Sequence, residues 1–172
     1  RTITFPDADI TLGASGDNTP AWQMSVNGNQ MSMTSQTTYT VNFDTVDFDT
    51  DSGCNTTDKT YTVPAGDGGK YMVGVWLWAG QNKGAGNYID GRLRLREDPA
   101  PGAENILVNW TSDWDTNPIF MNALGGARIL TLSAGDILYC DIAIHVNAGG
   151  NYGIIQDQDG CNVFYGYKLI GI

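Results

Sequence analysis

Short runs of alternating apolar and polar residues recur along this chain, and clusters of Gly, Asp, Asn and Pro separate them. Such runs predict β-strands, because successive side chains of a strand point to opposite faces of a sheet. No long window carries the 3.6-residue period of an amphipathic helix. About eight strands in one domain predict an all-β, antiparallel jelly-roll sandwich. The expected strands are Tyr39–Phe43, Lys59–Val63, Lys70–Ala79, Tyr88–Arg96, Asn105–Trp110, Arg128–Leu132, Asp136–Val146 and Asn162–Ile172.

The charge of the chain narrows the choice of partners. Its 19 acidic and 9 basic residues give a formal net charge of -10. A nucleic-acid backbone and an anionic membrane surface would both be repelled, so we expect neither as a partner. A membrane span would need about 20 consecutive apolar residues, and no run reaches that length. The charge leaves cation binding open.

The first 37 residues differ in pattern from the rest. Their few apolar side chains lie among Thr, Asp, Gly and Asn. We interpret residues 1–37 as an N-terminal arm or an additional edge strand, and residues 38–172 as the sandwich domain. An extended arm of this kind would fit against a neighbouring subunit.

Two of the expected strands are apolar on both faces. In KYMVGVWLWAG, Tyr71 and Val73 lie on one face while Trp76 and Trp78 lie on the other. The strand NVFYGYKLIGI has the same property. A strand in a lone sandwich should be apolar on its inner face only. The second apolar face therefore predicts oligomerisation, without defining the number of subunits.

Three segments in order resemble the complement C1q and tumour necrosis factor superfamily. TYTVPAGDGGKYMVGVWLW resembles the F-x-V-P-x-x-G-x-Y-x-F segment of C1q-like domains, LSAGDILYCDIA their L-x-x-G-D-x-V strand, and VFYGYKL their closing strand. VNFDTV is similar to their opening strand. The resemblance covers about Thr38 to Ile172.

The resemblance implies a ten-stranded jelly roll that assembles as a homotrimer. It also implies a binding or structural module rather than an enzyme. We expect the trimer interface to include five aromatic residues of the two strands that are apolar on both faces. These are Tyr71, Trp76, Trp78, Tyr165 and Tyr167.

The loops and the first segment differ from those of animal members of the superfamily. The chain lacks a collagen-like Gly-x-y repeat, and its loops are rich in Asp, Asn and Gly. In this it is similar to the jelly rolls of bacteriophage virions. The expected function is a trimeric capsid decoration (cement) protein on the virion surface, in contact with capsid or other virion proteins. One alternative is a receptor- or glycan-binding tip of a viral fibre, or a secreted C1q-like module. Another is a carboxylate-based hydrolase, although no acidic pair stands out.

The stretch DFDTDSGCNTTD is the candidate metal site. Its aspartates occupy positions 1, 3, 5 and 12 of a calcium-loop template, where oxygen ligands are required. Position 6 should be Gly but is Ser52, and the flanking segments are predicted strands. Two interpretations stay open: a calcium loop and a solvated acidic loop. The ligands would be Asp47, Asp49, Asp51 and Asp58.

The cysteines separate by position. Cys140 shares a strand face with Leu138 and Ile142, which predicts a buried free thiol. The resemblance implies that the opening strand runs antiparallel to the closing one, which would bring Cys54 near Cys161. We therefore expect a disulfide between Cys54 and Cys161, provided that the protein resides in an oxidising compartment.

Arg92, Arg94 and Arg96 alternate on one strand face and form a cationic stripe in an acidic chain. Such a stripe is a solvated face or a docking surface for an acidic neighbour.

Overall fold

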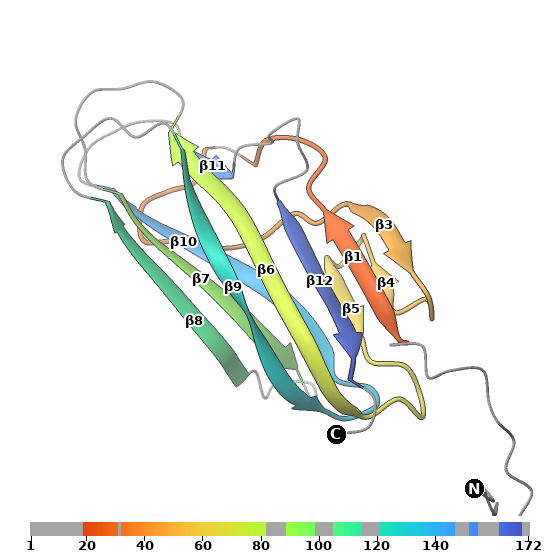
Figure 1. Ribbon diagram of the computed structural model, residues 1–172. Coiled ribbons are helices and arrows are strands. Elements are labelled where there is room, and N and C mark those ends of the chain that lie inside the picture. Colours follow the sequence, from red (N-terminus) through yellow and green to blue (C-terminus); the bar gives the residue numbers. More distant parts are fainter. Residues whose placement is uncertain are drawn as a thin grey trace, which may run out of the picture.

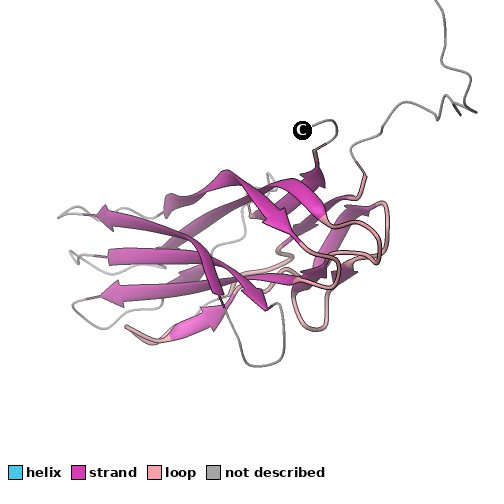
Figure 2. Ribbon diagram, turned by 90° about the horizontal axis from the view of Figure 1, so that it is seen from below, coloured by secondary structure: helices cyan, strands magenta, loops and turns pink. Residues whose placement is uncertain are grey.

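The structure is a computed structural model that describes residues 19–30, 32–81, 89–98, 105–114, 121–146, 152–154 and 162–169. The regular secondary structure of these residues consists of strands, with no helix, and the strands belong to two sheets (Figure 2). The described residues hold no helix that could span a membrane. Sheet A contains β1 (Ala21–Ser25), β3 (Thr45–Asp49), β6 (Gly69–Gln81), β9 (Met121–Leu132), β11 (Tyr152–Ile154) and β12 (Val163–Lys168). Sheet B contains β2 (Thr38–Thr40), β4 (Cys54–Asn55), β5 (Thr60–Thr62), β7 (Ile89–Asp98), β8 (Asn105–Trp114) and β10 (Ile137–Val146).

The two sheets lie face to face (Figure 1). Sheet A has the order β11-β6-β12-β1-β3, and β9 also pairs with β6. Sheet B has the order β4-β5-β10-β7-β8, and β2 also pairs with β10. The strand pairs are antiparallel, and several neighbours are far apart in sequence, as β1 and β12 are. The predicted antiparallel jelly-roll sandwich is therefore confirmed.

The core lies between the sheets and follows from the alternation of each strand. Trp22 of β1 stacks on Tyr61 of β5, with ring centroids 3.5 Å apart, and joins sheet A to sheet B. Gly166 of β12 lies beneath the Trp22 ring, because a Cβ at that position would come within 2.2 Å of the indole. The largest fully buried side chains are Trp22, Tyr61, Tyr71, Phe43, Phe164, Met24, Leu77, Leu95, Leu138 and Ile142.

The interpretation of residues 1–37 as an arm or an edge strand is wrong for the described part. Strand β1 is an interior strand that pairs with β12 on one side and with β3 on the other. Trp22 and Met24 of β1 are fully buried, and Met33 also belongs to the core. Only two of the five side chains of β1 are large and point inward. The strand therefore does not stand out from the low apolar content of residues 1–37. The sandwich therefore begins well before residue 38, and residues 1–18 lie outside the described ranges.

The expected strand Tyr39–Phe43 is also different in the structure. Strand β2 ends at Thr40 and β3 begins at Thr45, so the chain crosses from sheet B to sheet A between them. Val41 and Phe43 are fully buried in this crossing. Their alternation reflects burial between two sheets rather than one continuous strand.

Candidate interaction surfaces

The outer face of sheet A is apolar along its longest strand. In β6 the inward side chains are fully buried, and Met72, Gly74, Trp76 and Trp78 alternate with them and point outward. Trp76 is 44% exposed, a large value for an indole in the middle of a 13-residue strand. Large exposed apolar groups that gather on one face mark interaction sites.

Neighbouring strands extend this surface on both sides of β6. Met72 pairs with Tyr167 of β12 and with Ile129 of β9, and Ile129 is 56% exposed. Tyr165 lies over Gly74, where a Cβ would come within 2.3 Å of the phenol ring. Gly74 thus lets the Tyr165 ring lie close against the sheet. We call this surface the sheet A platform; it comprises Met72, Gly74, Trp76, Trp78, Ile129, Val163, Tyr165 and Tyr167.

Tyr71 does not belong to the platform, which corrects one of the expected interface residues. It lies on the inner face of β6, is fully buried, and donates a hydrogen bond from Oη to the Asp67 carbonyl at 2.6 Å. Burial raises the pKa of Tyr71 to about 12. The other four expected interface residues, Trp76, Trp78, Tyr165 and Tyr167, do lie on the outer face.

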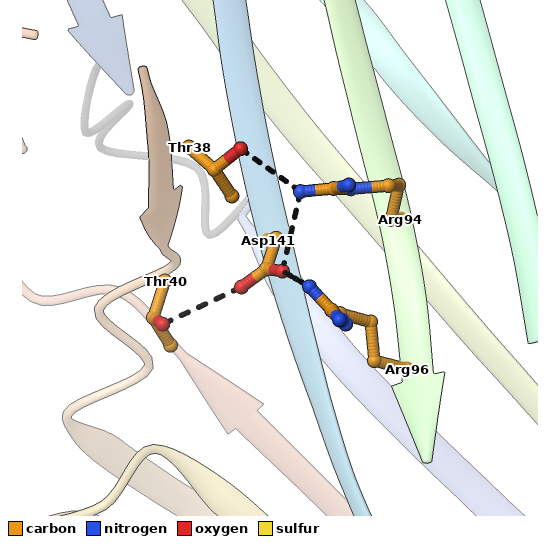
Figure 3. Close-up of polar contacts among 5 residues, drawn as sticks. All are labelled: Thr38, Thr40, Arg94, Arg96 and Asp141. Carbon is orange, nitrogen blue, oxygen red and sulfur yellow. Dashed lines mark hydrogen bonds and ion pairs between the residues drawn. The ribbon is translucent and has the colours of Figure 1, made fainter. Parts of the chain in front are cut away.

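The outer face of sheet B is polar and carries an ion-pair cluster (Figure 3). Asp141 of β10 is only 3% exposed, and its Oδ2 atom lies 2.8 Å from Arg96 Nη1 and 3.4 Å from Arg94 Nη2. Both arginines come from β7, the direct neighbour of β10. The alternation of Arg94 and Arg96, visible in the sequence, therefore places both side chains beside one carboxylate.

Strand β2 completes this cluster from the other side of β10. Arg94 Nη2 donates to Thr38 Oγ1 at 3.0 Å, and Thr40 Oγ1 lies 3.4 Å from Asp141 Oδ1 (Figure 3). The Arg96 guanidinium also lies 5.6 Å from the centroid of the Tyr139 ring, a cation–π distance. The cluster of Thr38, Thr40, Arg94, Arg96 and Asp141 thus ties three strands together across the outer face.

Comparison with known proteins identifies this architecture. No protein-family model matches the sequence, and no curated protein matches it. Solved structures do match. The Eiger TNF of S. frugiperda has 18% identity and a TM-score of 0.60, over 88% of this chain and 93% of that chain. Murine APRIL at pH 5.0 has 13% identity and a TM-score of 0.60, over 87% and 98% of the two chains. The globular domain of zebrafish complement 1qA has 19% identity and a TM-score of 0.54, over 87% and 97%.

The fold is the TNF/C1q-like jelly roll. At these identities the likeness defines the fold and leaves the activity to be argued from this chain's own surfaces. The matches cover a larger share of this chain than residues 38–172 make up, so they also agree with a sandwich that includes β1.

In this jelly roll the acidic segment 47–58 does not form one ligand loop. It contains the end of β3, a turn and strand β4. The Asp47 carboxylate accepts hydrogen bonds from Gln23 Nε2 at 2.9 Å and from Ser25 Oγ at 2.8 Å, both on β1. Asp47 therefore fixes β3 against β1.

The other three aspartates of this segment also have local partners. Asp49 accepts hydrogen bonds from the backbone N–H groups of Asp51 at 3.2 Å and Cys54 at 2.8 Å. Asp58 accepts one from Asn55 Nδ2 at 2.7 Å, and Asp51 accepts one from Thr50 Oγ1 at 2.5 Å. Among the described residues, no group of three or more His, Cys, Asp or Glu side chains is placed to hold a metal ion. Calcium binding by the four aspartates stays a prediction.

Cys140 is fully buried in the core beside Leu138 and Ile142, as its strand face predicted. Its thiol is free, and burial raises the thiol pKa well above the ordinary value. Cys140 thus behaves as a small apolar core residue.

The predicted partners Cys54 and Cys161 are not brought together by the strand order that we expected. Strand β12 lies between β6 and β1, and not beside β3. It begins near the end of β1, where the Val26 N–H donates to the Asn162 carbonyl at 3.2 Å. The chain leaves β3 at the other end of β1, where the Thr50 N–H donates to the Ala21 carbonyl at 3.0 Å.

Cys54 follows that exit, is half-buried, and has no disulfide partner among the described residues. Its thiol pKa is raised, first by burial and then by the charge of Asp49. Cys161 lies outside the described residues, so the disulfide stays a prediction, without the antiparallel pairing that first suggested it.

One acidic pair bears on the hydrolase alternative. Glu97 of β7 and Asp136, before β10, are hydrogen-bonded to each other, and burial together with Asp136 raises the pKa of Glu97. Glycosidase carboxylates are separated by about 5 Å or more to accommodate the sugar or a water. This pair is too close for that chemistry, and sequence reasoning missed it because the two residues are 39 positions apart.

Proposed function

We propose that this protein is a non-enzymatic structural and binding module that assembles as a homotrimer through the sheet A platform. The platform is the observation that supports the proposal. Trp76, Tyr165 and Tyr167 lie on the outer face of one sheet, and burying apolar surface contributes about 25 cal/mol per Å². A second copy of the same chain is the partner most readily available to cover this surface, and the assembled fraction rises with protein concentration.

Three-fold assembly requires a second surface. In a ring of three identical chains the contact is heterologous, so the platform of one chain meets a different surface of the next. The sandwich edge formed by β8 and β9 is suited to this role, since Ile106 of β8 is 53% exposed. The sequence resemblance to C1q-like domains supports three subunits rather than another number.

We further propose that the trimer decorates the capsid of a virion, on the outer surface of the particle. The support is compositional. The chain has a net charge of -10, and its Asp, Asn and Gly content resembles that of bacteriophage jelly rolls. The polar outer face of sheet B is suited to solvent, while sheet A is covered by the neighbouring chains.

The test of assembly is the mass in solution. Multi-angle light scattering should give about 56 kDa, three times the chain mass of 18.6 kDa, in a single peak at micromolar concentration. A monodisperse 18.6 kDa species would overturn the proposal.

The test of location is antibody labelling of virions in the electron microscope. Label spread over the capsid lattice is the expected result. Label confined to a fibre end would favour a receptor-binding tip, and label absent from the particle would favour a secreted module.

A further inference from the structure

Two exposed apolar side chains of sheet A are not used by the trimer proposal. The large apolar side chains that are exposed among the described residues are Val46, Phe48, Trp76, Ile106 and Ile129. Trp76 and Ile129 belong to the sheet A platform, and Ile106 lies on the β8–β9 edge. Val46 and Phe48 are 39% and 49% exposed and lie together on β3, at the other edge of sheet A from β9 (Figure 1). This edge is therefore a candidate surface for a separate contact.

Strand β3 has an open edge. It pairs with β1 on one side, and on the other side it has no strand partner among the described residues. An edge strand presents backbone N–H and C=O groups outward, and an extended segment can add to them as a further strand. The pairing with β1 shifts register between Phe48 and Val46, which leaves Asp47 as an extra residue. Because a bulge of this kind interrupts a ladder, we expect the added strand to be short.

The charges of β3 favour a partner strand that carries a basic residue. Natural edge strands often carry charges that discourage a second strand. The carboxylates of β3 are engaged within the chain, Asp47 by Gln23 and Ser25, and Asp49 by two backbone N–H groups that follow it. Their negative charge, together with that of Asp51, remains beside the open edge. A strand with a positive charge at the Asp51 end is therefore attracted to it.

The first five residues of the chain, RTITF, have the sequence that this edge requires. The β-branched residues and Phe5 of this RTITF segment favour a strand, and Pro6 ends it because proline has no N–H to donate. Ile3 and Phe5 supply apolar side chains at a spacing of two. Arg1 is the only basic residue before Lys59.

The length of the following segment favours a neighbouring molecule as the partner. The chain enters β1 beside the end of β3, where the Thr50 N–H donates to the Ala21 carbonyl at 3.0 Å. The 14 residues from Pro6 to Thr19 span up to about 45 Å when extended, whereas the five residues of β3 are only about 17 Å long. A connection of that length back to the β3 of the same chain would be unusual in a compact domain, while its reach is sufficient for an adjacent molecule.

We propose that the RTITF segment of one chain adds to the open edge of β3 in a neighbouring copy, as a short antiparallel strand. Phe5 then lies opposite Val46 and Ile3 opposite Phe48, which brings Arg1 to the acidic end of β3. Pairs of aromatic and β-branched side chains across two strands stabilise such a contact. The contact uses none of the platform residues, so it does not rest on the trimer proposal.

The experiment uses full-length chains with engineered cysteines. Ile3→Cys and Phe48→Cys are placed in separate chains, which are co-expressed and then oxidised. Non-reducing electrophoresis should show a disulfide-linked pair of about 37 kDa, twice the chain mass of 18.6 kDa, above the level in either variant alone. The matched control combines Ala14→Cys with Phe48→Cys. Because Ala14 lies near the RTITF segment but outside it, this control should give only the background of the wild-type cysteines.

Hydrogen exchange of the intact protein gives a second measurement. The backbone amides of residues 2–5 should exchange at least about tenfold more slowly than in a free peptide of the same sequence. Thr4→Pro removes an N–H from the added strand and should abolish both this protection and the cross-link, whereas Ala14→Pro should keep both. Melting temperature and solution mass verify that each variant is folded and assembled.

Three results would each overturn the proposal. The first is a cross-link no stronger than that of the Ala14→Cys control, and the second is exchange of residues 2–5 at the rate of the free peptide. The third is an Ile3→Cys/Phe48→Cys double variant whose new disulfide forms only within one chain, because the partner would then be the same molecule.

Discussion

The outer faces of the two sheets show how one alternating pattern leads to opposite surfaces. Both sheets place apolar side chains inward, where they are fully buried. The outward positions of sheet A hold Trp76 and Tyr165, whereas those of sheet B hold Arg94, Arg96 and Asp141. On sheet B, Arg94 and Arg96 find their partner, Asp141, within the same chain. On the outer face of sheet A, Trp76 and Ile129 remain exposed in the single chain, and we propose that neighbouring copies of the chain cover them. The first three predictions below test this difference in decreasing order of effect.

Placing a charge on the sheet A platform should abolish assembly. Trp76→Asp introduces a carboxylate into a surface that the trimer buries, and an uncompensated buried charge costs several kcal/mol. Because Trp76 is partly exposed in the single chain, the monomer should remain folded. Light scattering should then report a monomer with a cooperative thermal transition.

The matched control is Thr57→Asp in the exposed turn between β4 and β5, at the edge of sheet B opposite β8, which adds the same charge outside both proposed contact surfaces. Its mass should equal that of the wild type. Dissociation of both variants would mean that net charge, and not the platform, governs assembly.

The buried ion-pair cluster of sheet B should contribute much more to stability than the more exposed ion pair of Lys168, on β12 of sheet A, with Asp67. Asp141→Ala leaves Arg94 and Arg96 without their carboxylate and should lower the free energy of unfolding by about 3 kcal/mol. Asp67→Ala removes a pair with Lys168 at 3.1 Å, where both side chains are about a quarter exposed or more, and should cost about 0–1 kcal/mol.

Guanidinium titrations at one fixed protein concentration measure both values, since assembly makes stability depend on concentration. Equal losses in the two variants would show that burial of the Asp141 cluster has no special energetic role.

The Glu97–Asp136 pair predicts a smaller, pH-dependent effect. The pKa of Glu97 is raised in the folded state by burial and by Asp136, so the native protein holds this proton more tightly than the unfolded chain does. Its contribution to stability is therefore full below the unfolded pKa of about 4.3 and declines as the pH rises through the folded pKa.

Glu97→Gln imitates the protonated form, so at pH 7 it should have a higher melting temperature than the wild type. The corresponding gain in the free energy of unfolding should be less than about 1 kcal/mol after solvent screening. The difference should vanish near pH 4. Thermal melts between pH 4 and pH 8 measure it, and parallel curves for the two proteins across this range would contradict the assignment.

Much of the sandwich could be predicted from alternation alone. The faces of β6, β10 and β12 follow from the sequence, including the buried Cys140. Strand β1 could not be predicted, because a five-residue strand with Trp22 and Met24 inward has too short a pattern to stand out from a polar segment. Topology was equally hidden: the pairing of β1 with β12 joins positions more than 130 residues apart. The stripe of arginines could be predicted because its residues are close together in the sequence. Its contacts with Asp141 and Thr38 could not, because strand pairing brings these distant residues to it.

The acidic segment 47–58 lies where the chain passes from sheet A to sheet B, and it should show the smallest effect of all. Asp47 holds β3 to β1, Asp49 stabilises the turn before β4, and Asp51 and Asp58 each accept a hydrogen bond from a nearby side chain. A calcium site would need these oxygens to converge on one ion. If they did, a hundredfold excess of calcium over its dissociation constant would add about 2.7 kcal/mol of stability.

We expect instead that millimolar calcium shifts the melting temperature only slightly and that magnesium reproduces the shift. Asp49→Asn should destabilise the protein equally with and without calcium, because it weakens the acceptor for the backbone N–H groups of Asp51 and Cys54. A calcium-specific rise that Asp49→Asn and Asp51→Asn together remove would mean that the turn rearranges around an ion. The segment between the sheets would then be a ligand site, and the polar face would extend to the edge of sheet A.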